Sequence, residues 1–75
     1  MEDLIVYIAR ALVDEPEAVQ VRQVHGRQGP IYKLTVAPHD RGKIIGKDGR
    51  IIDAIRELLD VAAARQGIHV TLDVV

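Results

Sequence analysis

The 75-residue chain has no cysteine, no phenylalanine and no tryptophan, and it has only two tyrosines. Without cysteine, neither a disulfide nor a cysteine-based zinc site can support the fold. The shortage of aromatics argues against a base-stacking platform of the kind found in RRM and OB domains. We expect Tyr7 to lie in the core or at a helix edge, and Tyr32 on a strand face.

Long hydrophobic runs are also missing. No apolar stretch approaches the ~18 residues that indicate a membrane span, and the first residues show no secretory segment with a cleavage site. These absences predict a cytoplasmic protein with no membrane partner. The length predicts a single domain over residues 1–75. Such a chain buries only about 60% of its unfolded surface, so a dimer would add to its small core.

Charge of one sign is not in excess. The net charge of −1 and pI of about 6.3 argue against a polybasic nucleic-acid binder. The distribution is more informative than the sum. Residues 1–17 hold five acids and one base, whereas residues 41–50 hold four bases (Arg41, Lys43, Lys47, Arg50) and one acid (Asp48). The positive charge is therefore concentrated in one short stretch.

Hydrophobic periodicity predicts helices at residues 2–14, 41–45 and 50–67. Pro16 should end the first helix, Asp40 should N-cap the second, and Gly67 should stop the third. The core stripe of the first helix should hold Leu4, Ile5, Ile8, Ala9 and Leu12. The stripe of the third should hold Ile51, Ile52, Ile55, Leu58, Leu59 and Ala62.

Alternating residues predict strands at 18–24, 31–37 and 68–75. In the first strand Val24 is out of phase with Val19 and Val21, which indicates a bulge near its end. The last strand should bury Ile68, Val70, Leu72 and Val74. The order is therefore α-β-β-α-α-β. It predicts an α+β fold with a three-stranded mixed sheet that is covered by helices on one face and solvated on the other.

The stretch "GKIIGKDGR" carries the strongest functional signal. A glycine turn before the long helix places that helix's positive amino end, with its unpaired N–H groups, at the turn. Gly46 and Gly49 would let a phosphodiester approach the backbone, and Lys47 would add charge at the tip. Lys43, Arg50 and Arg41 flank the loop. We expect Asp48 to cap the long helix. The alternative is a plain turn between two helices.

Two other phosphate motifs are excluded by spacing. Gly42 and Gly46 lie one residue too close for a Walker A loop, and Asp48 stands where that motif requires Ser or Thr. A dinucleotide fingerprint also fails. His25, His39 and His69 share no metal-ligand spacing and are expected to be solvated. Arg56 is expected to pair weakly with Asp53 or Asp60. No catalytic constellation, metal or cofactor is predicted.

The segment "IIGKDGRII" (residues 44–52) resembles the KH domain, in which aliphatic residues flank a G-x-x-G loop. The element order resembles the type II arrangement, and the whole chain is similar to the bacterial KhpA family. By this resemblance Gly46, Lys47, Asp48 and Gly49 would meet the sugar-phosphate backbone of single-stranded RNA. Ile45 would line the nucleotide groove, and Ile52 would belong mainly to the core.

The resemblance also implies a wider role. It implies a sequence-tolerant RNA chaperone of the cytoplasm that pairs with a KhpB-type protein and influences cell shape and wall synthesis. A second hypothesis is a protein-interaction module that binds RNA only within a homo- or hetero-oligomer. Apolar residues outside the core stripes favour it, namely Val6, Val13, Val61 and Val75.

Overall fold

The computed structural model describes residues 1–75 and contains three α-helices and three strands. Their order is α1 (Glu2–Leu12), β1 (Gln20–His25), β2 (Pro30–Thr35), α2 (Arg41–Ile45), α3 (Arg50–Arg65) and β3 (Thr71–Val74). Short 3-10 turns at Pro16–Ala18, Pro38–Asp40 and Lys47–Gly49 join them. The predicted α+β class and the order α-β-β-α-α-β are confirmed.

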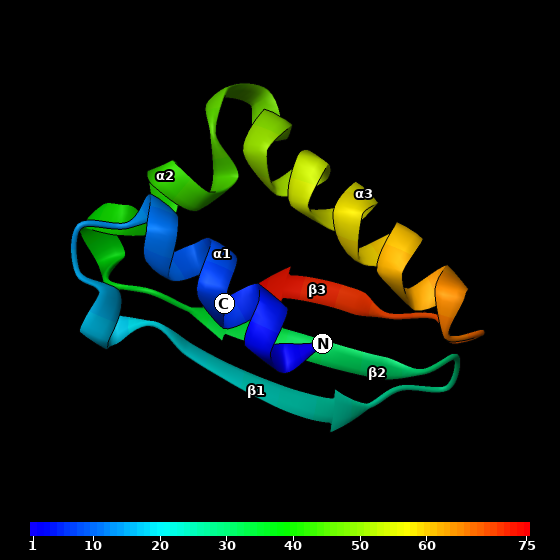
Figure 1. Cartoon of the computed structure of the whole chain (residues 1–75). Coiled ribbons are helices and arrows are strands. Elements are labelled where there is room, and N and C mark those ends of the chain that lie inside the picture. Colours follow the sequence, from blue (N-terminus) through cyan, green and yellow to red (C-terminus); the bar gives the residue numbers. More distant parts are fainter.

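The sheet has β2 at its centre, with β1 antiparallel on one side and β3 parallel on the other. Parallel neighbours need a long crossover, and helices α2 and α3 supply it. All three helices lie on one face of this mixed sheet (Figure 1). The other face is open and carries an ion pair between Lys33 and Asp73 at 3.1 Å.

The predicted bulge in the first strand is wrong. β1 and β2 pair without interruption from Gln20 opposite Thr35 to His25 opposite Pro30. Val24 is out of phase because it lies opposite Ile31 on the open face, whereas Val21 lies opposite the buried Leu34. A small apolar pair on the solvated side explains the broken alternation without any distortion of the strand.

The core lies between the sheet and the three helices. On β2 the predicted alternation is confirmed, and Tyr32 is buried on the strand face turned toward the helices. Thirteen buried apolar residues form one continuous cluster. They are Ile5, Ala9, Val19, Tyr32, Leu34, Val36, Ile44, Ile52, Ile55, Leu59, Ala63, Val70 and Leu72.

The helical stripes are narrower than the sequence predicted. On α3 the fully buried row consists of Ile52, Ile55, Leu59 and Ala63, while Leu58 keeps 59% of its surface exposed. Ile51 is also exposed and Ala62 is half-buried. The reason is geometric: the helix rests on a sheet of only three strands, which covers a single line of side chains along it.

On the first helix, too, the row of buried side chains is narrower than predicted. Only Ile5 and Ala9 are fully buried on α1, Ile8 packs against the core, and Leu4 and Leu12 are exposed. Tyr7 is 75% exposed, so the prediction of a core or helix-edge position is wrong. The last strand is also shorter than predicted, since it begins at Thr71 and leaves Ile68 exposed.

The observed ends of the helices agree with the predictions better than the buried rows do. α1 ends four residues before Pro16. Gly67 stops α3 in a left-handed conformation, and the N–H groups of Gly67 and Ile68 donate to the carbonyls of Ala64 and Ala63. This pattern is the Schellman motif. None of the helices combines the length and the apolar character that crossing a membrane requires.

Candidate nucleic-acid interface

Helix α2 has only five residues, too few to be stable without tertiary contacts. One contact is Ile44, whose surface is completely buried in the core. Burial of such a side chain contributes about 2–3 kcal/mol. The second contact is Asp40, which directly precedes the helix and is also completely buried. Together they fix the start and the middle of α2, and hence the direction in which the following loop leaves the core.

Asp40 occupies the N-cap position, but its side chain does not cap α2. Its two carboxylate oxygens accept hydrogen bonds from the backbone N–H groups of Asp14 (3.1 Å) and Glu15 (3.0 Å). The 3-10 turn at Pro38–Asp40 runs straight into α2, and the carboxylate points to the segment after α1 instead. We call Asp14, Glu15 and Asp40 the Asp40 clasp, because these bonds fasten that segment to α2.

The pKa of Asp40 reflects two opposing influences. Burial would raise it, but the two backbone N–H donors, together with His39 and Lys43 nearby, hold the pKa below its ordinary value. The carboxylate is therefore ionised at neutral pH. No buried side-chain nitrogen or oxygen lacks a hydrogen-bond partner. The Asp40 carboxylate is thus hydrogen-bonded where it is buried, and the fold avoids the larger cost of an unpaired buried charge.

Two of the predicted RNA-binding cations are already engaged. The ammonium of Lys43 lies 3.1 Å from a carboxylate oxygen of Asp14 and 3.7 Å from one of Asp40. Its hydrogen bond to Asp14 raises the pKa of Lys43. The guanidinium of Arg41 donates to the backbone carbonyl of Val75 at 2.6 Å. Both side chains therefore turn toward the body of the domain, which reduces the positive charge available at the loop.

The loop begins where Gly46 ends α2. Its N–H donates to the carbonyl of Gly42 at 2.8 Å, and its φ of 75° and ψ of 172° are costly for residues with a Cβ. A Cβ here would also lie 2.6 Å from Cγ1 of Ile51. Gly46 is therefore required twice, by its backbone conformation and by its close contact with the next helix.

The predicted cap by Asp48 is wrong. Asp48 is exposed, adopts a left-handed conformation (φ 57°, ψ 24°), and its carboxylate caps nothing. Gly49, also at positive φ, is the residue before α3, so no side chain caps the first turn of this helix. The amino end of a 16-residue helix consequently has no side-chain acceptor.

Lys47 and Arg50 are the cations that remain free at this end. Both are exposed, and neither takes part in an ion pair within the chain. Ile45, the last residue of α2, is half-buried against the core, and Ile52 is a core residue as predicted. In Figure 1 the loop arches on the side of the helical layer that faces away from the sheet. An anion could reach its backbone from solvent.

Sequence reasoning missed two polar contacts. The side chain of His39 is exposed, as expected, but its Nε2 also lies 3.2 Å from a carboxylate oxygen of Glu15 and 3.6 Å from one of Asp40. No spacing rule could reveal this contact, since Glu15 is distant in sequence. The Nε and Nη2 of Arg56 donate to the Leu72 carbonyl at 3.2 and 3.0 Å, in addition to the predicted pairing with Asp53 at 3.7 Å.

One cluster resembles a metal site by distance alone. Ligand atoms of Asp14, His39 and Asp40 lie within 4.8 Å of one another. The ammonium of Lys43, however, already contacts both carboxylates. This cation balances the negative charge that a metal ion would otherwise neutralise, so the cluster is explained as part of the clasp.

A G-x-x-G turn joins two helices that lie on one face of a three-stranded mixed sheet. This arrangement is that of a type II KH domain. The sequence matches the KhpA/KhpB KH-domain family over residues 2–74. The chain belongs to this family. Its members are RNA-binding KH proteins rather than enzymes, in agreement with the absence of a catalytic constellation in the sequence.

Similar proteins cover the chain from end to end. The RNA-binding protein KhpA of Caldanaerobacter subterraneus subsp. tengcongensis is 48% identical over 75 residues, all of both chains. That of Chlamydia caviae is 50% identical over 99% of this chain and 95% of its own. That of Treponema pallidum is 46% identical over 99% and 92%. No solved structure matches the chain significantly.

Proposed function

We propose that the protein binds single-stranded RNA with the loop Gly46–Gly49 against the sugar-phosphate backbone. The observation that carries this proposal is the uncapped amino end of α3, reached through two glycines at positive φ. Membership of a family whose relatives are named RNA-binding proteins supports it. In KH domains a G-x-x-G loop clamps a stretch of four nucleotides.

The charged side chains around the loop determine how strongly it would bind RNA. Lys47 and Arg50 attract phosphate, whereas Lys43 and Arg41 act mainly within the domain, since their side chains are engaged. With few free cations and a net charge of −1, the isolated domain should bind weakly and with little sequence preference. Its dissociation constant should fall near the non-specific range of about 10⁻⁴ to 10⁻⁶ M. Weak, tolerant binding suits an RNA chaperone.

The test replaces the loop charges. We expect Lys47→Asp combined with Gly49→Asp to weaken binding to a single-stranded oligonucleotide by more than about tenfold, because a phosphate would then meet two added carboxylates. Fluorescence anisotropy at several salt concentrations measures the effect. Parent affinity should fall as salt rises, since phosphate contacts release counterions.

A matched control separates the loop from net charge. Arg65→Asp with Gln66→Asp makes the same change in net charge at the opposite end of α3, about 24 Å away. Circular dichroism must first show that both double variants are folded. Equal affinity of the loop variant and the parent, or equal losses in the two double variants, would contradict the assignment of the loop.

The second candidate is an oligomeric module in which RNA binding depends on avidity. Exposed apolar side chains on α1 and α3 favour it, among them Tyr7, Leu58 and Val61. Two linked weak sites can bind far more tightly than one. A KhpB-type protein as the second subunit and a role in cell shape and wall synthesis are proposals that rest on the resemblance alone. The proposal of a cytoplasmic location rests on the resemblance and on the composition of the sequence.

A further inference from the structure

The open face of the sheet, which no helix covers, holds a second concentration of positive charge. Residues 18–39 contain three bases and no acid. Arg22 of β1 lies directly opposite Lys33 of β2, and Lys33 in turn lies opposite Asp73 of β3. All three lie on the open face, since the next pair along, which contains the buried Leu34, faces the helices.

The charges of this row are not balanced. The Lys33 ammonium lies 3.1 Å from a carboxylate oxygen of Asp73. The Arg22 guanidinium is exposed and has no ion pair or side-chain hydrogen bond within the chain. Like charges directly opposite each other on neighbouring strands destabilise a sheet. The Arg22–Lys33 pair therefore carries a cost that a bound anion offsets.

Two hollows adjoin the open face, and each contains one free arginine. The first has a volume of about 470 Å³ and is lined by Gln20, Val21, Arg22, Lys33, Thr35 and Val75. The second, at the tip of the β1–β2 hairpin, has a volume of about 240 Å³ and is lined by Gly26, Arg27, Gln28, Gly29, Ile31 and Thr71. Arg27, like Arg22, is exposed and forms no ion pair within the chain. The same chemistry is thus present at both ends of one face.

The row between the two arginines is apolar. Val24 and Ile31 lie opposite each other on the open face, and both are half-buried. Thr35 lines the first hollow and Ile31 lines the second, and they are about 14 Å apart along β2. A short stretch of single-stranded nucleic acid spans such a distance.

From this arrangement we infer that the open face binds a second segment of single-stranded RNA, separate from the segment at the loop. Arg22 and Arg27 each hold a phosphate, since a planar guanidinium donates two parallel hydrogen bonds to phosphate oxygens. A base lies against Val24 and Ile31, and the Thr35 hydroxyl bonds to a sugar hydroxyl. The inference rests on the proposed function for its ligand class, but no residue of the loop takes part.

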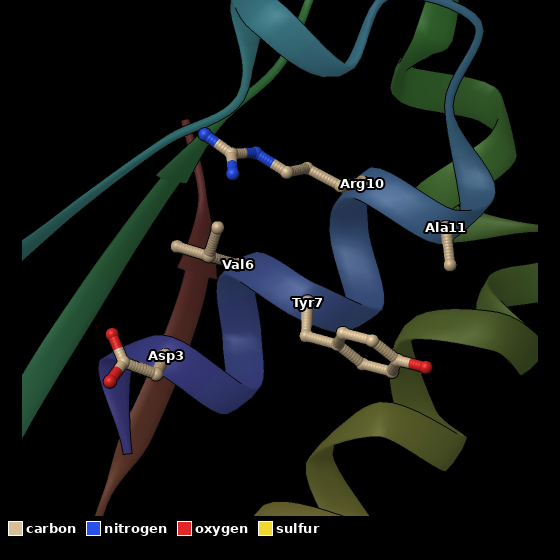
Figure 2. A pocket seen from close by; sticks show the side chains of 5 residues that line it. All are labelled: Asp3, Val6, Tyr7, Arg10 and Ala11. Atoms are coloured by element: carbon tan, nitrogen blue, oxygen red, sulfur yellow. The ribbon is translucent and has the colours of Figure 1, made fainter.

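Geometry and charge favour RNA over other occupants of this face. An extended peptide adds to the edge of a sheet, because the backbone hydrogen-bonding groups of strands point along the sheet and not out of its face. A lipid surface requires a larger cluster of cations with protruding apolar side chains, whereas Val24 and Ile31 are half-buried. The hollow on α1 provides a contrast, since it contains Asp3 as well as Arg10 and has no excess of positive charge (Figure 2).

Nuclear magnetic resonance tests both surfaces in one titration. Nuclease-treated, ¹⁵N-labelled protein is titrated with a single-stranded RNA of about eight nucleotides. We expect amide signals to shift in two separate groups, one at Gly46–Gly49 and one at Arg22, Lys33 and the hairpin tip. Shifts confined to the loop would overturn this inference alone. Shifts confined to the open face would contradict the proposed function of the loop alone.

Removal of the two arginines measures their contribution. Arg22→Gln with Arg27→Gln is introduced into the loop variant Lys47→Asp with Gly49→Asp, and RNA binding is followed by fluorescence anisotropy. The residual binding should weaken by about fivefold or more. The slope of log affinity against log salt should fall by about 1.4, because each phosphate contact to a single strand contributes about 0.7. Arg22→Gln removes a like charge opposite Lys33, so Tm should not fall.

A matched control removes two arginines outside the open face. Arg10→Gln with Arg65→Gln, in the same loop variant, takes the same charge from exposed positions on α1 and α3 that form no ion pair. It should leave the affinity within about twofold and the salt slope unchanged. Equal losses in the two pairs would reduce the effect to net charge and overturn the inference. A glutamate-rich peptide that shifts the open-face signals while RNA leaves them unmoved would assign the face to a protein partner and also overturn it.

Discussion

Two aspartates lie at the two ends of helix α2 and have opposite roles. Asp40 is completely buried and accepts hydrogen bonds from two backbone N–H groups. Asp48 is exposed, adopts a left-handed conformation and caps nothing. Both precede helical residues, and the sequence predicted a helix cap for both. Neither carboxylate caps the backbone N–H groups of the helix that follows it.

This difference separates a rigid supporting element from an exposed loop that can bind a ligand. The start of α2 is fixed by buried polar bonds and by Ile44. The end of α2 is an exposed turn, free of side-chain caps, and available to a ligand. A rigid support next to an open loop is the general arrangement of binding sites on protein scaffolds. Stability should therefore depend on Asp40, and binding on the loop.

The largest expected effect follows from removing the Asp40 carboxylate. Asp40→Ala leaves the part-buried N–H groups of Asp14 and Glu15 without their acceptor and leaves a cavity where the buried carboxylate was. We expect Tm to fall by more than about 10 °C. Thermal unfolding followed by circular dichroism measures this change. Asp60→Ala, at an exposed aspartate without an ion pair, should change Tm by no more than about 3 °C. Similar losses in the two variants would contradict the role of the clasp.

The same carboxylate should govern acid stability. The pKa of Asp40 is lower in the folded protein than the ordinary value of 3.8. Its stabilising contribution is therefore present above pH 3.8 and disappears as the pH falls through the folded pKa. Asp40→Asn should lose this part of the acid slope of Tm, although it remains less stable near neutral pH. Parallel slopes for parent and variant would show that other groups control acid unfolding.

An intermediate effect is expected at Gly46. Gly46→Ala forces a Cβ to within 2.6 Å of Ile51 and into a backbone conformation that L-residues rarely adopt. We expect Tm to fall by about 5–10 °C. Gly42→Ala, at a helical position with no atom within 4 Å of the new Cβ, should raise Tm by a few degrees. Differential scanning calorimetry of the pair provides the measurement, and a harmless Gly46→Ala would mean that the loop readily rearranges.

The smallest effect is expected at Asp48. Asp48→Asn keeps a side chain that tolerates the left-handed conformation and removes one negative charge beside Lys47. RNA affinity should rise by about two- to threefold at low salt, and the gain should vanish at high salt because exposed charges are screened. Asp60→Asn, which removes an equal charge from the outer face of α3, should bring no gain in the same anisotropy assay. A loss of affinity in Asp48→Asn would instead indicate that the carboxylate contacts RNA.

Patterns that depend on neighbouring residues predicted the fold well. The order of the elements, the alternation on β2, the stop at Gly67 and the turn at Gly46–Gly49 were all predictable, because they follow from local backbone preferences and periodicity. The predicted width of the helical stripes was wrong. Leu58 and Tyr7 are exposed because a three-stranded sheet covers only one row of each helix.

The sequence by itself determined the class of fold, the family and the place of the glycine loop, because these depend on residue types at fixed spacings. Only the tertiary structure decided which charges are free. Lys43, Arg41 and Arg56 bond to Asp14, Val75 and Leu72, each far away along the chain. Such partners are selected by packing, since a side chain bonds to whatever the fold brings near it. Lys47 and Arg50 remain free at the loop because neither forms an ion pair within the chain.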